Sequence, residues 1–115
     1  MDSREMAKIV CKALDEKKAI DVKAIDISEV SVMADYFIVA SASNQNQLNA
    51  MQDEVDRVLY ENGIHAKSIE GNRSSTWVLM DYEDVIVHLF SEEDRLFYDL
   101  ERIWKDGIII DANEL

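Results

Sequence analysis

The chain has 115 residues, 48% of them hydrophobic and 31% charged, a composition typical of one globular domain and not of a disordered or fibrous protein. Twenty-four acidic residues against twelve basic ones give a formal net charge of −12, which disfavours direct binding to nucleic acid or anionic lipid and favours a basic protein partner. We expect a single cytoplasmic domain over residues 1–115, because Cys11 has no internal disulfide partner and no segment resembles a leader or could span a bilayer.

The first half of the chain alternates helical and extended patterns. Apolar residues recur with a helical period over Ser3–Lys18, and Val22–Ile27 predicts a strand. Tyr36–Ala40 is a nearly continuous apolar run, typical of a strand that is covered on both faces. Helical spacing resumes at Leu48 and stops at Asn62-Gly63, which predicts a second helix.

The second half is richer in strand patterns. Ile64–Ile69 is a candidate strand, and Thr76–Asp81 with Val85–Phe90 predicts a hairpin. Ser91-Glu92-Glu93-Asp94 has the spacing of a capping box and predicts a third helix. The apolar side of that helix would consist of Leu96, Phe97, Leu100, Ile103 and Trp104. Ile108–Ile110 is either a short edge strand or a docking segment. This order predicts an α/β fold with one mixed sheet and helices packed on it.

Metal and nucleophile chemistry have weak support in the sequence. The candidate soft ligands Cys11, His65 and His88 lie in three different predicted elements, without the spacing of a metal motif, so we expect no metal. Ser41 and Ser43 follow a strand and precede a helix, where backbone amides could hold an anion. Because no glycine-rich elbow or phosphate loop surrounds them, a turn with helix-capping serines is the favoured interpretation.

Three carboxylates offer an alternative function. Asp81 and Asp84 flank the hairpin turn, and Asp35 begins another strand, so together they could support metal- or nucleotide-dependent phosphoryl transfer. A site of this type would also need a Gly-Ser turn that leads into a D-x-D or D-x-E strand, and the sequence has neither. Asp81 is equally well explained as a turn residue whose side chain accepts hydrogen bonds from nearby backbone amides.

The hairpin also has the composition of a protein interface. Strand alternation places Trp77, Leu79 and Asp81 on one face and Met80 with Tyr82 on the other. An aromatic residue, a flexible methionine and carboxylates on one hairpin resemble the hot spots of protein interfaces. Core packing is an equal alternative for Trp77 and the favoured one for Trp104. A general acidic adaptor that dimerises through a sheet edge or the Ile108–Ile110 segment is a further hypothesis.

Five stretches of the sequence carry a family signature: Ala34–Ser41, Glu70–Gly71, Trp77–Tyr82, Asp84–Phe90 and Tyr98–Trp104. Together they resemble the ribosomal silencing factor family, also called the Iojap family, over almost the whole chain and in the same order. Three positions depart from the family pattern: Asn46-Gln47 replaces a frequent Arg-Gln, Thr76 replaces a glycine before the tryptophan, and Glu83-Asp84 replaces a frequent Gly-Asp.

The resemblance implies a nucleotidyltransferase-like fold without the catalytic residues, no enzyme activity and no cofactor. It implies a translational repressor that binds the large ribosomal subunit through large-subunit ribosomal protein fourteen and blocks joining of the small subunit. A homodimer is compatible with the family. Positions that match the family signature are Trp77, Asp81, Tyr82, Asp84 and His88, and the expected protein interface comprises Trp77, Leu79, Met80, Asp81, Tyr82, Asp84 and His88. For His88, a structural hydrogen bond is an equal alternative.

Overall fold

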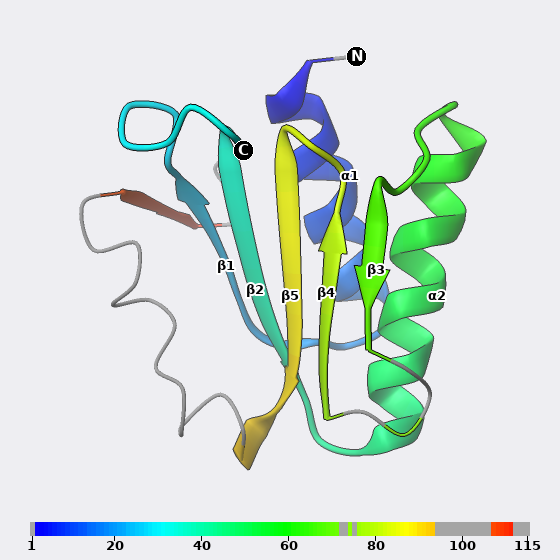
Figure 1. The fold of residues 1–115 in the computed structure, drawn as a ribbon. Helices are drawn as coiled ribbons and strands as arrows, with labels where there is room; N and C mark the ends of the chain where they lie inside the picture. Colours follow the sequence, from blue (N-terminus) through cyan, green and yellow to red (C-terminus); the bar gives the residue numbers. More distant parts are fainter. Residues whose placement is uncertain (1, 72–73, 75, 94–106, 112–115) are drawn as a thin grey trace.

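The computed structural model describes residues 2–71, 74, 76–93 and 107–111, which form helices packed on one sheet (Figure 1). The elements in chain order are α1 (Ser3–Glu16), β1 (Ile20–Asp26), β2 (Tyr36–Ala42), α2 (Gln45–Glu61), β3 (Ser68–Glu70), β4 (Trp77–Asp81), β5 (Val85–Ser91) and β6 (Ile108–Asp111). The third helix predicted after the capping box Ser91-Glu92-Glu93-Asp94 falls, from Asp94 through Trp104, outside the described residues, and Ser91 itself ends β5. Neither α1 nor α2 is long and apolar enough to cross a membrane.

The sheet is mixed, as the sequence predicts. Its strand order is β3-β4-β5-β2-β1-β6. The two central strands β2 and β5 run parallel, and the other neighbouring pairs are antiparallel. The predicted hairpin is present as β4 and β5, and the Ile108–Ile110 segment is part of the edge strand β6, paired with β1.

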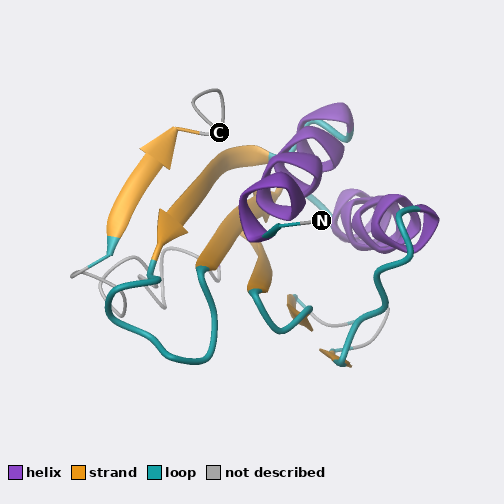
Figure 2. Cartoon of the chain, turned by 90° about the horizontal axis from the view of Figure 1, so that it is seen from above, coloured by secondary structure: helices purple, strands orange, loops and turns teal. Residues whose placement is uncertain are grey.

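Both described helices lie side by side on one face of the sheet (Figure 2). The 3.6-residue period of α1 buries Met6, Val10 and Leu14 on one stripe, and the Asp2 side chain caps the helix by accepting from the amide of Glu5. The stripe packs on alternate residues of β2, among them Ile38 and Ala40. Full burial of one such leucine side chain stabilises the fold by about 1.5–3 kcal/mol.

A second apolar cluster lies on the opposite face of the sheet. It contains the alternate residues Phe37 and Val39 of β2, together with Ile25, Ile27 and Phe90. Every residue of β2 is buried, which confirms the prediction of a strand that is covered on both faces. We call this side of the sheet the open face only because the described helices α1 and α2 both pack on the other side; the cluster itself is buried.

The strand predicted at Ile64–Ile69 is largely wrong, because β3 covers only Ser68–Glu70. After α2 the chain turns at Gly63, whose φ of +78° is readily adopted by glycine, and the amide of Ile64 donates back to the carbonyl of Leu59. This turn directs Ile64 into the core as part of a loop. Its apolar pattern therefore reflects loop packing and not strand pairing.

Candidate protein-binding face

The β4–β5 hairpin presents three cross-strand pairs on the open face. In the register of the two strands, Trp77 lies opposite Phe90, Leu79 opposite His88 and Asp81 opposite Ile86. The intervening residues, such as Val78 and Met80, point to the helix-covered face and join its core. The predicted separation of Trp77, Leu79 and Asp81 from Met80 and Tyr82 is thereby confirmed.

Trp77 is held half-exposed at this surface by His88. Its indole Nε1 donates to the imidazole Nδ1 at 3.3 Å, and 37% of its surface stays accessible. The Phe37 ring lies 4.3 Å from the imidazole, and the Phe90 ring stacks near both. Because the indole N–H already has a hydrogen-bond partner within the protein, a binding partner can bury the apolar part of the Trp77 ring without leaving this donor unsatisfied.

Burial makes the His88 imidazole an acceptor. The residue is 9% exposed among aromatic rings, and this desolvation lowers its pKa to about 4. The imidazole is therefore neutral at pH 7 and leaves one nitrogen free to accept the indole hydrogen bond. For His88 the structure shows the structural hydrogen bond that the sequence left as an equal alternative. The imidazole supports Trp77 and has little exposed surface of its own.

Two predicted interface residues do not reach the surface. Met80 is fully buried and Tyr82 is 4% exposed, both in the core beneath the helices. The Tyr82 hydroxyl donates to Asp56 Oδ1 at 2.9 Å, and burial together with this carboxylate raises the pKa of Tyr82. Their burial removes Met80 and Tyr82 from the candidate contact surface, where Trp77, Leu79, Asp81 and Asp84 remain.

Carboxylates gather at the hairpin turn. Asp81 Oδ1 accepts from the amide of Glu83 at 2.8 Å, as expected for a turn residue. Glu83 has a φ of +68°, a conformation that favours glycine, at the position where the family often has Gly. The backbone carbonyl of Asp84 accepts from the amides of Asp35 and Tyr36, so the turn is fixed to the start of β2.

Two of the three carboxylates of the enzyme hypothesis, Asp81 and Asp84, line one groove at the turn, and Asp35 does not line it. The Asp35 carboxylate accepts from the Ser3 hydroxyl at 2.7 Å. Asp81 lies on the open face and caps the hairpin turn. Within the described ranges, no group of three or more His, Cys, Asp or Glu side chains could hold a metal ion, which includes Cys11, His65 and His88. The described residues therefore provide no metal-binding group for the phosphoryl-transfer alternative.

The serine turn before α2 is a helix cap, although the capping residue is different from the one predicted. Ser41 is buried in β2, and the Asn44 side chain is the N-cap, accepting from the amide of Gln47. Ser43 donates both its amide and its hydroxyl to Gln47 Oε1, at 2.7 and 2.9 Å. The Gln47 amide group also donates to the carbonyls of Lys17 and Lys18, which links α2 to the end of α1.

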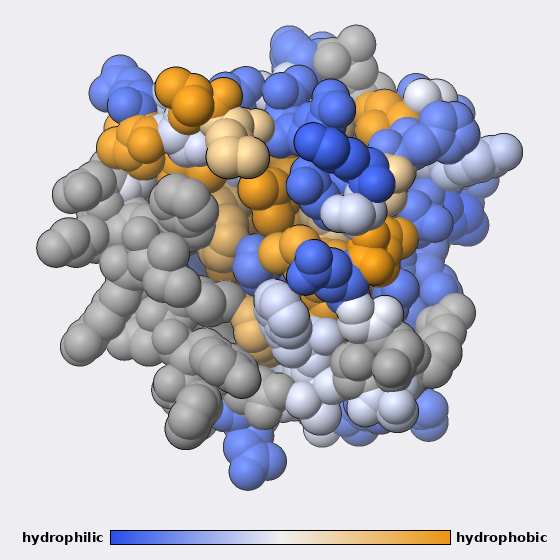
Figure 3. All heavy atoms as spheres, viewed as in Figure 1, coloured by the Kyte–Doolittle hydropathy of each residue, from blue (hydrophilic) through white to orange (hydrophobic). Residues whose placement is uncertain are grey.

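Sequence reasoning did not identify the loop between β1 and β2. Three of its residues are exposed hydrophobics: Val30, Val32 and Met33. Figure 3 shows hydrophobic side chains at upper left, where this loop lies, and further hydrophobic patches in the middle of the face, with hydrophilic residues between them and to the right. An apolar cluster between two strands, at Val30-Ser31-Val32-Met33, was the available signal. Its exposure depends on the loop backbone and is not visible in the sequence.

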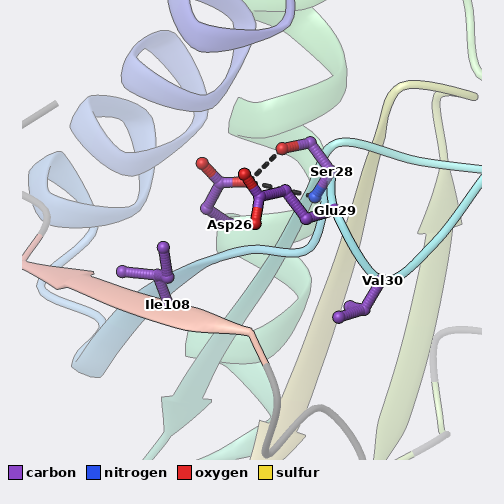
Figure 4. Close-up of a pocket in the computed structure, with 5 residues that line it drawn as sticks. All are labelled: Asp26, Ser28, Glu29, Val30 and Ile108. Atoms are coloured by element: carbon purple, nitrogen blue, oxygen red, sulfur yellow. Dashed lines mark hydrogen bonds between the residues drawn. The ribbon is translucent and has the colours of Figure 1, made fainter.

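Met33 also lines a shallow groove beside the hairpin turn. The other lining residues are Lys67, Asp81, Glu83, Asp84 and Ile86. Nearby, a smaller and more enclosed pocket lies between the start of the loop and β6 (Figure 4), lined by Asp26, Ser28, Glu29, Val30 and Ile108. In that pocket Ser28 donates its amide and hydroxyl to Asp26 Oδ1, at 3.0 and 2.7 Å, which fixes the path of the chain into the loop.

The described residues form a small α/β domain in which a supported aromatic residue lies on an apolar face that ends in carboxylates. The comparisons with known proteins identify its family. The chain belongs to the family described as "Ribosomal silencing factor during starvation", whose sequence profile matches residues 1–115.

Relatives and solved structures agree with this assignment. The chain is 37% identical to the ribosomal silencing factor RsfS of Bacillus subtilis over 113 residues, which cover 98% of this chain and 96% of that protein. It is 26% identical to the chloroplastic protein Iojap of Zea mays over 102 residues, 89% of this chain and 44% of that protein. A crystal structure from Chromobacterium violaceum superposes with a TM-score of 0.88 at 32% identity, covering 91% of this chain and 88% of the other. A second, from Bacillus halodurans, has a TM-score of 0.83 at 32% identity, with 94% and 98% coverage.

Proposed function

We propose that this protein represses translation by binding the large ribosomal subunit through large-subunit ribosomal protein fourteen, and that the bound protein blocks joining of the small subunit. Membership of the ribosomal silencing factor family supports association with the ribosome. The choice of partner and the block of joining come from the family resemblance.

The observation that carries the proposal is the half-exposed Trp77 on the open face. A large aromatic ring that is already oriented loses little conformational freedom when a partner covers it. The rigid support from His88 and Phe90 provides this orientation. Anchors of this kind contribute 2 kcal/mol or more to many protein interfaces, which is about a 30-fold effect on Kd.

The charge of the molecule supports a protein partner of opposite sign. The net charge is −12, and Asp81 with Asp84 lies at the end of the open face. Such a field accelerates encounter with a basic protein and opposes approach to the phosphates of ribosomal RNA. On this proposal, binding weakens as salt is raised, because the ionic atmosphere screens the attraction.

A Trp77→Ala variant tests the proposal in sucrose gradients of purified large subunits, followed by a subunit-joining assay. Wild-type protein is expected to sediment with large subunits and to suppress joining, whereas Trp77→Ala is expected to bind about 30-fold more weakly. Tyr60→Ala is the matched control, because Tyr60 is an exposed aromatic residue on α2. Circular dichroism verifies that both variants fold.

Two outcomes contradict the proposal. Wild-type protein that stays at the top of the gradient removes ribosome binding, and equal binding by Trp77→Ala removes the tryptophan as the anchor. Formation of a homodimer is a separate prediction, which sedimentation equilibrium of the isolated protein checks.

A further inference from the structure

The β1–β2 loop exposes hydrophobic side chains although its backbone is well fixed. Val32 is fully exposed and Met33 is 78% exposed. The loop is closed at its base by the amide of Ile27, which donates to the carbonyl of Asp35 at 2.8 Å, and the amides of Val30 and Ser31 donate to the carbonyl of Ile27. A fixed loop that keeps neighbouring apolar side chains in water is characteristic of an interaction site.

This loop and the hairpin turn form one structural unit. The amides of Asp35 and Tyr36 donate to the carbonyl of Asp84 at 2.8 and 3.1 Å, so the end of the loop is tied to the turn. Met33 from the loop and Ile86 from β5 line the same groove as the turn carboxylates. Apolar surface from one segment therefore lies next to negative charge from the other.

The groove has the chemistry to receive a cationic side chain with an apolar stem. Three carboxylates, Asp81, Glu83 and Asp84, line it against the single ammonium group of Lys67. Lysine and arginine lay their aliphatic stems along apolar surface and keep the charged end at a polar rim, and a guanidinium also pairs with carboxylates through two parallel hydrogen bonds. Nucleic-acid phosphates would meet repulsion here.

We propose that the β1–β2 loop is a second arm of the binding face and that the groove between Met33, Ile86 and the turn carboxylates receives an arginine or lysine of a basic protein segment. The proposal rests on the proposed function and extends it: the partner is held by Trp77 on the hairpin and by a cation at the groove. At the groove itself, charge favours such a segment over the same groove of a second copy, because carboxylates would then face carboxylates; this leaves a homodimer through another surface unaffected.

Two double variants test the proposal by sedimentation with purified large subunits over a series of salt concentrations. Val32→Ser with Met33→Ser removes the exposed apolar surface and is expected to raise Kd about tenfold. Asp81→Asn with Asp84→Asn keeps the side-chain shapes and the turn acceptor, removes two charges, and is expected to raise Kd and to reduce its dependence on salt.

The matched controls carry the same kinds of change on the helix side of the molecule. Tyr60→Ser removes an exposed apolar residue of α2, and Glu16→Gln removes an exposed charge at the end of α1. Both are expected to bind as the wild type does. The second arm is overturned if both double variants bind with wild-type affinity and wild-type salt dependence while Trp77→Ala loses binding. That result leaves the proposed function standing.

If wild-type protein does not sediment with large subunits, the proposed function fails and a direct probe decides on the groove. The probe is the peptide acetyl-Leu-Arg-Arg-Leu-amide, titrated into methyl-labelled protein, with its glutamine counterpart as the control. Saturable shifts of the Met33 and Ile86 methyl signals with the arginine peptide alone support the cation site. Absent shifts, or equal shifts with both peptides, overturn it.

Discussion

At the scale of single residues, the candidate binding face depends on a tryptophan that is held by a neutral histidine. The sequence correctly separates Trp77 from Met80 by strand alternation, but it does not say which of the two faces the helices cover. That choice is made by the packing of α1 and α2, which buries Met80 and leaves Trp77 accessible. The hydrogen bond from Trp77 to His88 is diagonal across the hairpin, because Leu79 and not Trp77 lies directly opposite His88.

His88 makes the stability of the protein depend on pH. Its pKa is lowered to about 4 in the folded state from an unfolded value near 6.5, so the unfolded chain binds more protons between these values. Stability from this group is present above about pH 6.5 and is lost as the pH falls toward 4. Between pH 7 and pH 5 the loss is about 2 kcal/mol.

A His88→Gln variant tests this dependence, because glutamine has a side-chain oxygen that can accept from the indole but does not titrate. Urea unfolding at pH 7 and pH 5 is expected to show a smaller pH effect in the variant than in the wild type, by about 2 kcal/mol. An identical pH effect in both proteins would mean that the pKa of His88 is the same in the folded and unfolded states.

At the scale of secondary-structure elements, the hairpin is anchored to α2 by a side-chain hydrogen bond. Tyr82 begins the link between β4 and β5, and its hydroxyl reaches Asp56 in the middle of α2. Tyr82 matches the family signature, and because it is buried its role here is to hold the hairpin to α2. The sequence identified the residue but not its role, because Asp56 is 26 positions away and its direction depends on how α2 lies across the sheet.

A Tyr82→Phe substitution is expected to destabilise the protein by about 1–2 kcal/mol, because it leaves the partly buried Asp56 carboxylate without this donor. A double-mutant cycle with Asp56→Ala, measured by urea unfolding, isolates the coupling between the two side chains. Additive effects of the two changes would show that the hydrogen bond contributes nothing to stability.

The elements with strong periodicity were predictable, and the irregular ones were not. The apolar stripe of α1 suits a helix that buries one side, and the apolar run of β2 suits a strand buried on both faces. The structure confirms both predictions. In the predicted strand Ile64–Ile69, residues 64–67 instead form a loop after the turn at Gly63, and strand pairing begins only at Ser68. The exposed β1–β2 loop has no periodicity at all, so its part in the candidate face could come only from the structure.

At the scale of the whole molecule, the two faces of the sheet differ in what packs on them and in what they expose. The helix-covered face holds the larger core and contains Cys11. The open face carries Trp77 and, at one end, the acidic groove. Changes on the open face can therefore alter binding while the main core stays intact.

Cys11 provides a probe of this main core. Burial raises the pKa of its thiol to about 12, so the reactive thiolate is essentially absent in the folded protein at pH 7–8. Labelling with a thiol reagent is expected to be slow in native buffer and to speed up with urea in parallel with loss of the circular dichroism signal. Fast labelling in native buffer would show that α1 detaches before the rest of the protein unfolds.

The strand order also determines how the molecule can assemble during its own synthesis. β1 and β2 are neighbours in both sequence and sheet, so they can pair soon after they are made. The parallel partner of β2 is β5, which is made only after α2, β3 and β4, and the outer partner of β1 is β6, the last described strand. Until then a nascent chain presents an apolar two-stranded ribbon with two unpaired edges, the kind of surface that chaperones protect.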